Sequence, residues 1–282
     1  MISETTVAAV ADTLSKQEET VGGWISHHIQ NSSEWHLPGL PLHLPHFKPF
    51  HILGMEVDLS ITNHTVMLWI AGIIVISLFV FFYDRRKKVP TGFGAILEML
   101  VVFVRDEIAI ANMGEKEGHR FTPLLVSFFF FILIANLMGL VPLFSTSTSN
   151  INVTAALALV TFGATQIYGI KQNGFIKYYT SLVPHGVPLL LWPLMFVIEI
   201  MGLIAKHVAL TIRLFANMIA GHIVLFAFIG LIIIFKSFLV APVSVGFGIF
   251  VYFLEILVAF IQAYIFTVLS ALFIGMSVNP EH

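Results

Sequence analysis

The chain has 282 residues, of which 57% are hydrophobic and only 11% are charged. An average soluble domain is about 25% charged, so this composition excludes a soluble globular enzyme and a disordered chain. The formal net charge of −2 offers no basic surface to a nucleic acid, and the absence of cysteine excludes disulfides and thiolate chemistry. The apolar runs are long enough for helices, so we predict an all-α integral membrane protein.

The chain opens with a polar segment, residues 1–61, which we expect on the extracytoplasmic side of the membrane. Its His-rich part, 22–58, repeats no metal-ligand spacing, so we predict no metal site there. The first transmembrane helix is predicted over residues 62–84 and ends at the basic run DRRKK. Such a run is a strong stop signal on the cytoplasmic side of a membrane.

A loop over residues 85–120 follows, and we expect it in the cytoplasm. Within it, residues 95–111 have the pattern of an amphipathic helix, with Glu98, Arg105 and Asp106 on one side and apolar residues on another. The helix is short and charged, so we predict that it lies along the membrane surface rather than crossing it.

The rest of the chain, residues 121–282, has few charges and is predicted to form the membrane core. Its uncharged polar link STSTSN is expected to be an exposed turn. The last two apolar runs far exceed the roughly 20 residues that cross a bilayer, so we predict two long, strongly tilted helices that form a hairpin. The predicted membrane-embedded helices, with one surface helix beside them, number five: 62–84, about 121–144, 151–170, 187–235 and 242–278.

The distribution of Lys and Arg predicts the orientation. The loops 84–120 and 171–186 carry nine of these residues, whereas the loops on the opposite side carry three in a greater total length. Because cytoplasmic loops are enriched in positive charge, we expect an extracytoplasmic N-terminus and a cytoplasmic C-terminus.

The first long helix carries ionisable residues at a regular spacing. Glu199, Lys206 and Arg213 recur every seven residues, and Asn217 follows four residues later. Seven residues make two helical turns less about 20°, so these side chains form one narrow stripe. An ionisable group in hydrocarbon costs a few kcal/mol or more, and it usually faces protein or water along an ion path.

The antiparallel hairpin predicts which polar residues of the two long helices meet. With its turn near residues 238–239, residues whose numbers sum to about 477 should lie opposite one another. This pairs His222 with Glu255, and Arg213 with Gln262. A His–Glu pair can relay protons, whereas the guanidinium of Arg213 stays charged and can only attract a carboxylate or repel a cation.

Several stretches of the sequence resemble subunit a of F-type ATP synthases, in its bacterial type. Arg213 lies in VALTIRLFANMIAGH (208–222), and Glu255 lies in YFLEILVAFIQAYIFTVL (252–269), which is similar to the last helix of that family. Three further stretches also fit: NLMGLVP at 136–142, NINVTAALAL at 150–159 and RRKKVPTGFGAILEML at 85–100.

The resemblance implies a multi-pass stator subunit in the bacterial plasma (inner) membrane, which is not catalytic on its own and needs no cofactor. It implies two proton half-channels beside a rotating ring of subunit c, with peripheral-stalk subunit b, the soluble catalytic head reached through the stalks, and membrane lipid as further partners. Arg213 would be the essential ring-facing arginine that separates the half-channels. The proton path would comprise His222, Glu255, Asn217 and Gln262 for uptake, Glu199 for release, and Asn152 and Asn136.

Two departures from the family pattern and one rival function remain. The acid and the histidine of the uptake pair are exchanged here, as in mitochondrial-type members, and Gly139 stands where some members have Asp. The rival is a secondary ion or solute transporter with Arg213 and Glu199 in its substrate site, although no internal repeat supports it. Asn136 and Asn152 can either join helices or line a water-filled channel.

Overall fold

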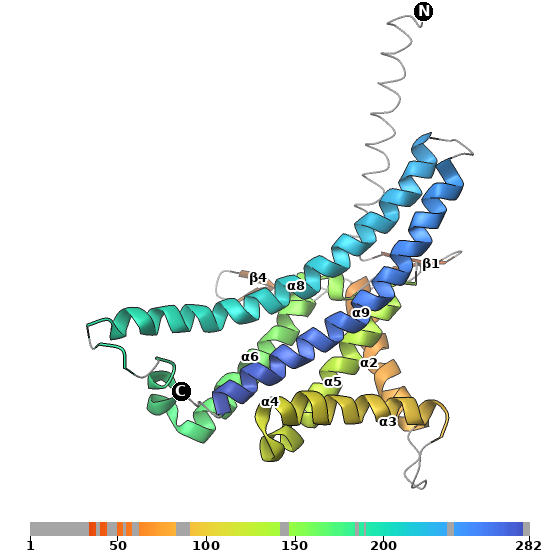
Figure 1. Ribbon diagram of the computed structural model, residues 1–282. Helices are drawn as coiled ribbons and strands as arrows, with labels where there is room; N and C mark the ends of the chain where they lie inside the picture. The colour runs from red at the N-terminus through yellow and green to blue at the C-terminus, as the bar shows by residue number, and fades with distance from the viewer. Residues whose placement is uncertain are drawn as a thin grey trace, which may run out of the picture.

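Figure 1 shows the computed structural model of the chain, in which a long helical hairpin crosses a group of shorter helices. The predicted stop signal after the first span, the turn near residues 238–239 and most of the His-rich segment lie outside the described residues. The structure describes residues 34–37, 40–43, 50–52, 55–57, 62–82, 91–141, 147–183, 186–188, 190–235 and 240–278.

Two short β-hairpins precede the first membrane helix. Strand β1 (Glu34–Leu37) pairs antiparallel with β2 (Leu40–His43), and β3 (Phe50–Ile52) pairs antiparallel with β4 (Met55–Val57). All described elements from Asn63 onward are helical. Five of these helices are long and apolar enough to cross a membrane, so the predicted all-α membrane fold is confirmed.

The first three spanning helices are α2 (Asn63–Phe82), α5 (Glu115–Gly139) and α6 (Ile151–Asn173). Helix α5 begins about six residues before the prediction and ends about five residues earlier. Hydropathy marks only the apolar part of a helix, and the charged first turns of α5 continue that helix beyond it. Helix α6 begins where Asn150 accepts a hydrogen bond from the backbone N–H of Asn152 at 2.9 Å, as an N-cap does.

The predicted amphipathic helix is one continuous helical stretch over residues 93–113. It consists of α3 (Phe93–Phe103), a π-helical segment η1 (Val104–Ile110) and the short α4 (Ala111–Met113). In Figure 1 this stretch runs across the lower ends of α2 and α5. Its buried residues Val104 and Ile108 join the main core, so its apolar side faces the bundle.

The two long helices are α8 (Trp192–Phe235) and α9 (Val240–Val278), with the short α7 (Phe175–Thr180) before them. Helix α8 starts five residues later than predicted, because Pro193 occupies its first turn, where a missing N–H is tolerated. At about 1.5 Å per residue, α8 and α9 are about 66 and 58 Å long, twice the hydrocarbon thickness. Both cross the shorter helices obliquely in Figure 1, and α6 fills the space where they separate.

The core lies where α5 and α9 pack together and where α6 contacts both long helices. Aromatic side chains dominate it, and Phe129, Phe130 and Phe266 are fully buried. Helix α9 also passes so close to α4 that a Cβ atom at Gly275 would collide with the backbone carbonyl of Asn112. Only glycine permits this close approach, so Gly275 holds the end of α9 against the surface helix.

Gly275→Ala is expected to destabilise the protein by about 1–3 kcal/mol, because backbone cannot yield as a flexible side chain can. The measurement is the thermal midpoint of the purified complex in detergent. Gly246→Ala in the same helix is the matched control, since a Cβ atom at Gly246 has no neighbour within 4 Å. An equal midpoint for both variants would contradict the close packing at Gly275.

Candidate functional site

His222 of α8 and Glu255 of α9 face one another across the hairpin, as the antiparallel numbering predicts. The imidazole Nδ1 lies 3.9 Å from the carboxylate Oε1, and the two side chains are 17% and 12% exposed. Gly221 lies directly against this carboxylate, where a Cβ atom would collide with Oε1. The missing side chain at Gly221 therefore makes the room in which Glu255 approaches α8.

The second predicted pair, Arg213 with Gln262, is wrong. The Nδ2 atom of Asn217 donates a hydrogen bond of 2.8 Å to Oε1 of Gln262 instead. Gln262 is 1% exposed, whereas Arg213 lies on the exposed side of α8. The register itself is close to the prediction, since both observed pairs lie within two residues of it; the partner was wrong because position along the helices does not determine the direction of a side chain.

Within the part of the chain that the structure describes, Arg213 makes no hydrogen bond or ion pair. Its neighbours on the same exposed face of α8 are small residues that leave the backbone open to a close approach. These neighbours are Ala205, Ala209, Ala216 and Ala220.

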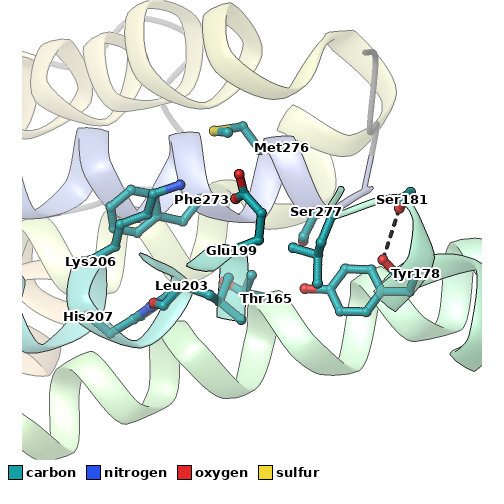
Figure 2. A pocket seen from close by; sticks show the side chains of 11 residues that line it. Thr165, Tyr178, Ser181, Glu199, Leu203, Lys206, His207, Phe273, Met276 and Ser277 are labelled. Carbon is teal, nitrogen blue, oxygen red and sulfur yellow. Dashed lines mark hydrogen bonds between the residues drawn. The ribbon is translucent and has the colours of Figure 1, made fainter. Parts of the chain in front are cut away.

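Glu199 lies 14 residues, or about 21 Å, before Arg213 along α8. It lines a cavity of about 70 Å³, and Figure 2 shows its carboxylate reaching toward Met276 of α9. Arg213 is not part of this cavity. The rival arrangement, with Glu199 and Arg213 in one substrate site, therefore has no support in the geometry. The lining residues come from α6 to α9: Thr165, Tyr178, Ser181, Leu182, Glu199, Leu203, Lys206, His207, Phe273, Met276 and Ser277.

Tyr178 of α7 forms one wall of this cavity and is held in place from α6. Its hydroxyl accepts a hydrogen bond of 3.2 Å from Nε2 of Gln166, and its ring lies against Gly169, where a Cβ atom would strike it. Burial raises the pKa of Tyr178. The phenol is therefore neutral and serves as a fixed polar group beside the cavity.

Another buried polar group lies in the last turn of α5. Asn136 is fully buried, and its Oδ1 accepts a hydrogen bond of 2.8 Å from Thr148. The expected exposed turn is wrong here, because Ser147, Thr148 and Ser149 form a buried 3-10 turn, η2 (Ser147–Ser149). Lack of charge allowed this link to fold into the protein. Asn152, by contrast, is exposed.

The sequence reasoning missed His207, Tyr178 and Thr148 as members of polar clusters. His207 and Tyr178 have no polar counterpart that the sequence pattern pairs with them, and Thr148 lies in the STSTSN link, which was expected to be exposed. The available signal was weak: His207 directly follows Lys206 of the ionisable stripe. Only the packing of α6, α7 and α9 around α8 brings Tyr178 and His207 to the same cavity, and only the fold of η2 against α5 brings Thr148 to Asn136.

Comparisons with known proteins point to one family. A family model described as ATP synthase A chain matches residues 65–275. The chain is 52% identical over 232 residues to ATP synthase subunit a of Myxococcus xanthus, covering 80% of this chain and 75% of that protein. It is 48% identical over 246 residues to the subunit a of Chloroherpeton thalassium, covering 83% and 73%. It is 45% identical over 281 residues to ATP synthase subunit a 2 of Chlorobium luteolum, covering 97% and 80%.

Proposed function

The chain belongs to the ATP synthase A chain family, and from this premise we propose that it is the membrane stator of a proton-driven rotary motor. In this proposal it forms two half-channels against a rotating ring of subunit c. Protons enter through one half-channel, travel on carboxylates of the ring and leave through the other. The chain itself is not catalytic, and it couples proton flow to ATP synthesis in the soluble head.

The observation that carries the proposal is the position of Arg213. A permanently charged side chain in hydrocarbon costs several kcal/mol unless it faces a partner or water. Arg213 has no partner among the described residues and lies on a face with alanines on both sides of it. This combination suits a second helix from another chain that carries a carboxylate and packs closely on α8.

We assign the uptake half-channel to the His222–Glu255 pair, with Asn217 and Gln262 leading toward Arg213. Support comes from their order along the hairpin: the pair lies nearer the turn, and the Asn–Gln hydrogen bond lies one to two turns closer to Arg213. The buried Asn136 and the exposed Asn152 flank this path in our proposal.

We assign the release half-channel to Glu199 and its cavity, on the opposite side of Arg213. A guanidinium between two aqueous paths repels protons on either side, because it cannot itself give up a proton. Protons then cross only on the ring. Each charge that moves through 100 mV releases about 2.3 kcal/mol, and this energy becomes available only as rotation.

The proposed setting is the bacterial plasma (inner) membrane. Residues 1–61 lie on the extracytoplasmic side, the loop 85–120 and the C-terminus lie in the cytoplasm, and 121–282 form the channel core. The ring of subunit c covers the Arg213 face of α8. Membrane lipid and peripheral-stalk subunit b cover apolar faces that this chain leaves exposed, such as the outer side of α2 with Trp69 and Ile73. The soluble head connects through the stalks.

Purification of the tagged chain from its native membranes tests this proposal. We expect a ring of small hairpin subunits, a stalk subunit and a nucleotide-binding head to copurify with it. The same preparation in lipid vesicles should acidify the lumen when ATP is added. Recovery of the chain alone, with solute uptake that needs no ATP, would support the transporter and overturn the stator.

A further inference from the structure

His207 is a buried polar residue that the proposed half-channels do not use. Its side chain lies between Phe162 of α6 and Phe273 of α9, with ring centroids 5.0 and 5.2 Å away. The residue is 6% exposed. Its Nδ1 atom lies 2.9 Å from the backbone carbonyl oxygen of Leu203, which can only accept, so Nδ1 carries the hydrogen and donates a hydrogen bond to that oxygen.

This hydrogen bond leaves Nε2 of His207 as an acceptor. Nε2 is buried, and no described residue offers it a hydrogen bond. A buried acceptor without a donor costs about 1–3 kcal/mol. Nε2 is therefore a buried acceptor that the described residues leave unsatisfied, and a donor from outside the chain would satisfy it.

The cavity beside His207 can supply that donor. His207 lines the same cavity of about 70 Å³ as Glu199. A water molecule needs roughly 15 Å³ of such space and two to four polar partners, so the cavity has room for several waters. Polar lining groups are present at Thr165, Tyr178 and Ser277, as Figure 2 shows.

His207 lies between Glu199 and Arg213 along α8, so waters between His207 and Glu199 would extend along the helix away from Arg213. His207 lies six residues from Arg213 and eight from Glu199, which is about 9 and 12 Å along the helix axis. It therefore divides the distance between the ring-facing arginine and the release carboxylate. Continuous waters from His207 to Glu199 would bridge more than half of that distance.

We propose that His207 anchors, through Nε2, the inner end of a file of water molecules that leads along the cavity to Glu199. The innermost water donates one hydrogen to Nε2 and uses its remaining hydrogen and lone pairs for the next water. His207 is thus a positioning residue for proton release. This inference rests on the proposed function, because it assumes that protons leave past Glu199.

Two substitutions at position 207 separate water binding from packing. In His207→Gln the side-chain amide can still accept a hydrogen bond, whereas His207→Phe fills the space between Phe162 and Phe273 but accepts none. We expect ATP-driven proton pumping in vesicles to fall about tenfold in His207→Phe and less than threefold in His207→Gln. A packing role predicts the opposite order, so a Phe variant as active as the Gln variant overturns the proposal.

The control is Phe162→Leu, which loosens the same packing without removing a polar atom. We expect its pumping rate to stay close to the parent rate. Loss of pumping in Phe162→Leu as large as in His207→Phe would likewise indicate packing and overturn the proposal. All variants are compared at equal amounts of assembled complex.

If both variants at position 207 fail to assemble, the test is a density map of the intact parent complex, at a resolution that shows ordered water. The map shows whether water lies beside Nε2 of His207. Density about 2.7–3.2 Å from Nε2 of His207, continuing toward Glu199, supports the proposal. A protein or lipid atom at that place, or dry packing against the rings, overturns it.

The stator assignment and this inference can fail separately. Pumping that survives in Arg213→Ala overturns the stator function itself. If Arg213→Ala and Glu199→Gln stop pumping but His207→Phe pumps at the parent rate, only the role of His207 is overturned.

Discussion

Arg213→Ala is expected to abolish ATP-driven proton pumping, to less than about one hundredth of the parent rate, which corresponds to about 2.7 kcal/mol or more. The alanine has no charge to draw the ring carboxylate into its deprotonated state as it passes. It also leaves no fixed positive charge between the two half-channels. The measurement is the rate of acidification of inverted membrane vesicles after addition of ATP.

Arg120→Ala is the matched control for this experiment. Arg120 also belongs to a spanning helix, but it lies in the second turn of α5, is 47% exposed, and pairs with Glu117 at a distance of 3.6 Å. It lies outside the proposed proton path, so pumping per assembled complex should stay near the parent rate. Arg213→Lys keeps the positive charge but replaces the planar guanidinium and its N–H donors with an ammonium group, so it tests the donor geometry separately from the charge. Normal pumping in Arg213→Ala would remove the central residue from the proposed mechanism.

Glu255→Gln is expected to slow proton uptake by about 10²-fold or more, the range by which positioned acids and bases accelerate proton transfer. The amide has nearly the same shape as the carboxylate but cannot accept and pass on a proton beside His222. The measurement is the pumping rate together with the rate of ATP synthesis under an imposed proton gradient. Both should fall together, since both need the uptake path.

Two further variants sharpen the result at Glu255. Glu115→Gln changes an exposed carboxylate at the start of α5 and should leave pumping unchanged. Gly221→Ala keeps the carboxylate of Glu255 but pushes it away from α8, because the new Cβ would collide with Oε1. An intermediate loss is expected there. A parent rate in Glu255→Gln would make the carboxylate a structural partner of His222.

The geometry explains why these two substitutions should have the largest effects. Arg213 and Glu255 lie on different sides of the hairpin, one exposed toward a partner and one largely buried inside the chain. In the proposed mechanism, Arg213 blocks direct passage of protons between the half-channels, and Glu255 carries protons into the uptake path. Loss of either function would stop rotation.

The linear pattern of residues was enough for the membrane fold and for one polar pair. Long apolar runs must become helices in hydrocarbon, because no water is present to satisfy their backbone groups. The seven-residue spacing placed Glu199, Lys206 and Arg213 on one stripe through helical geometry alone. The pairing of His222 with Glu255 followed from the short link between two antiparallel helices, which leaves little freedom of register.

The tertiary structure decided what depends on side-chain direction and on segments far apart in the chain. In the folded chain Gln262 accepts a hydrogen bond from Asn217 and not from Arg213. Arg213 stays exposed because no neighbouring helix of this chain covers its side of α8 among the described residues. The tertiary structure turned the link at 147–149 inward, because Asn136 offers a buried acceptor there. It also placed His207 beside the cavity of Glu199, where α6, α7 and α9 meet α8. The spacing of residues along a helix determines which side chains share a face, but only the packing of the helices determines which residues of other segments contact that face.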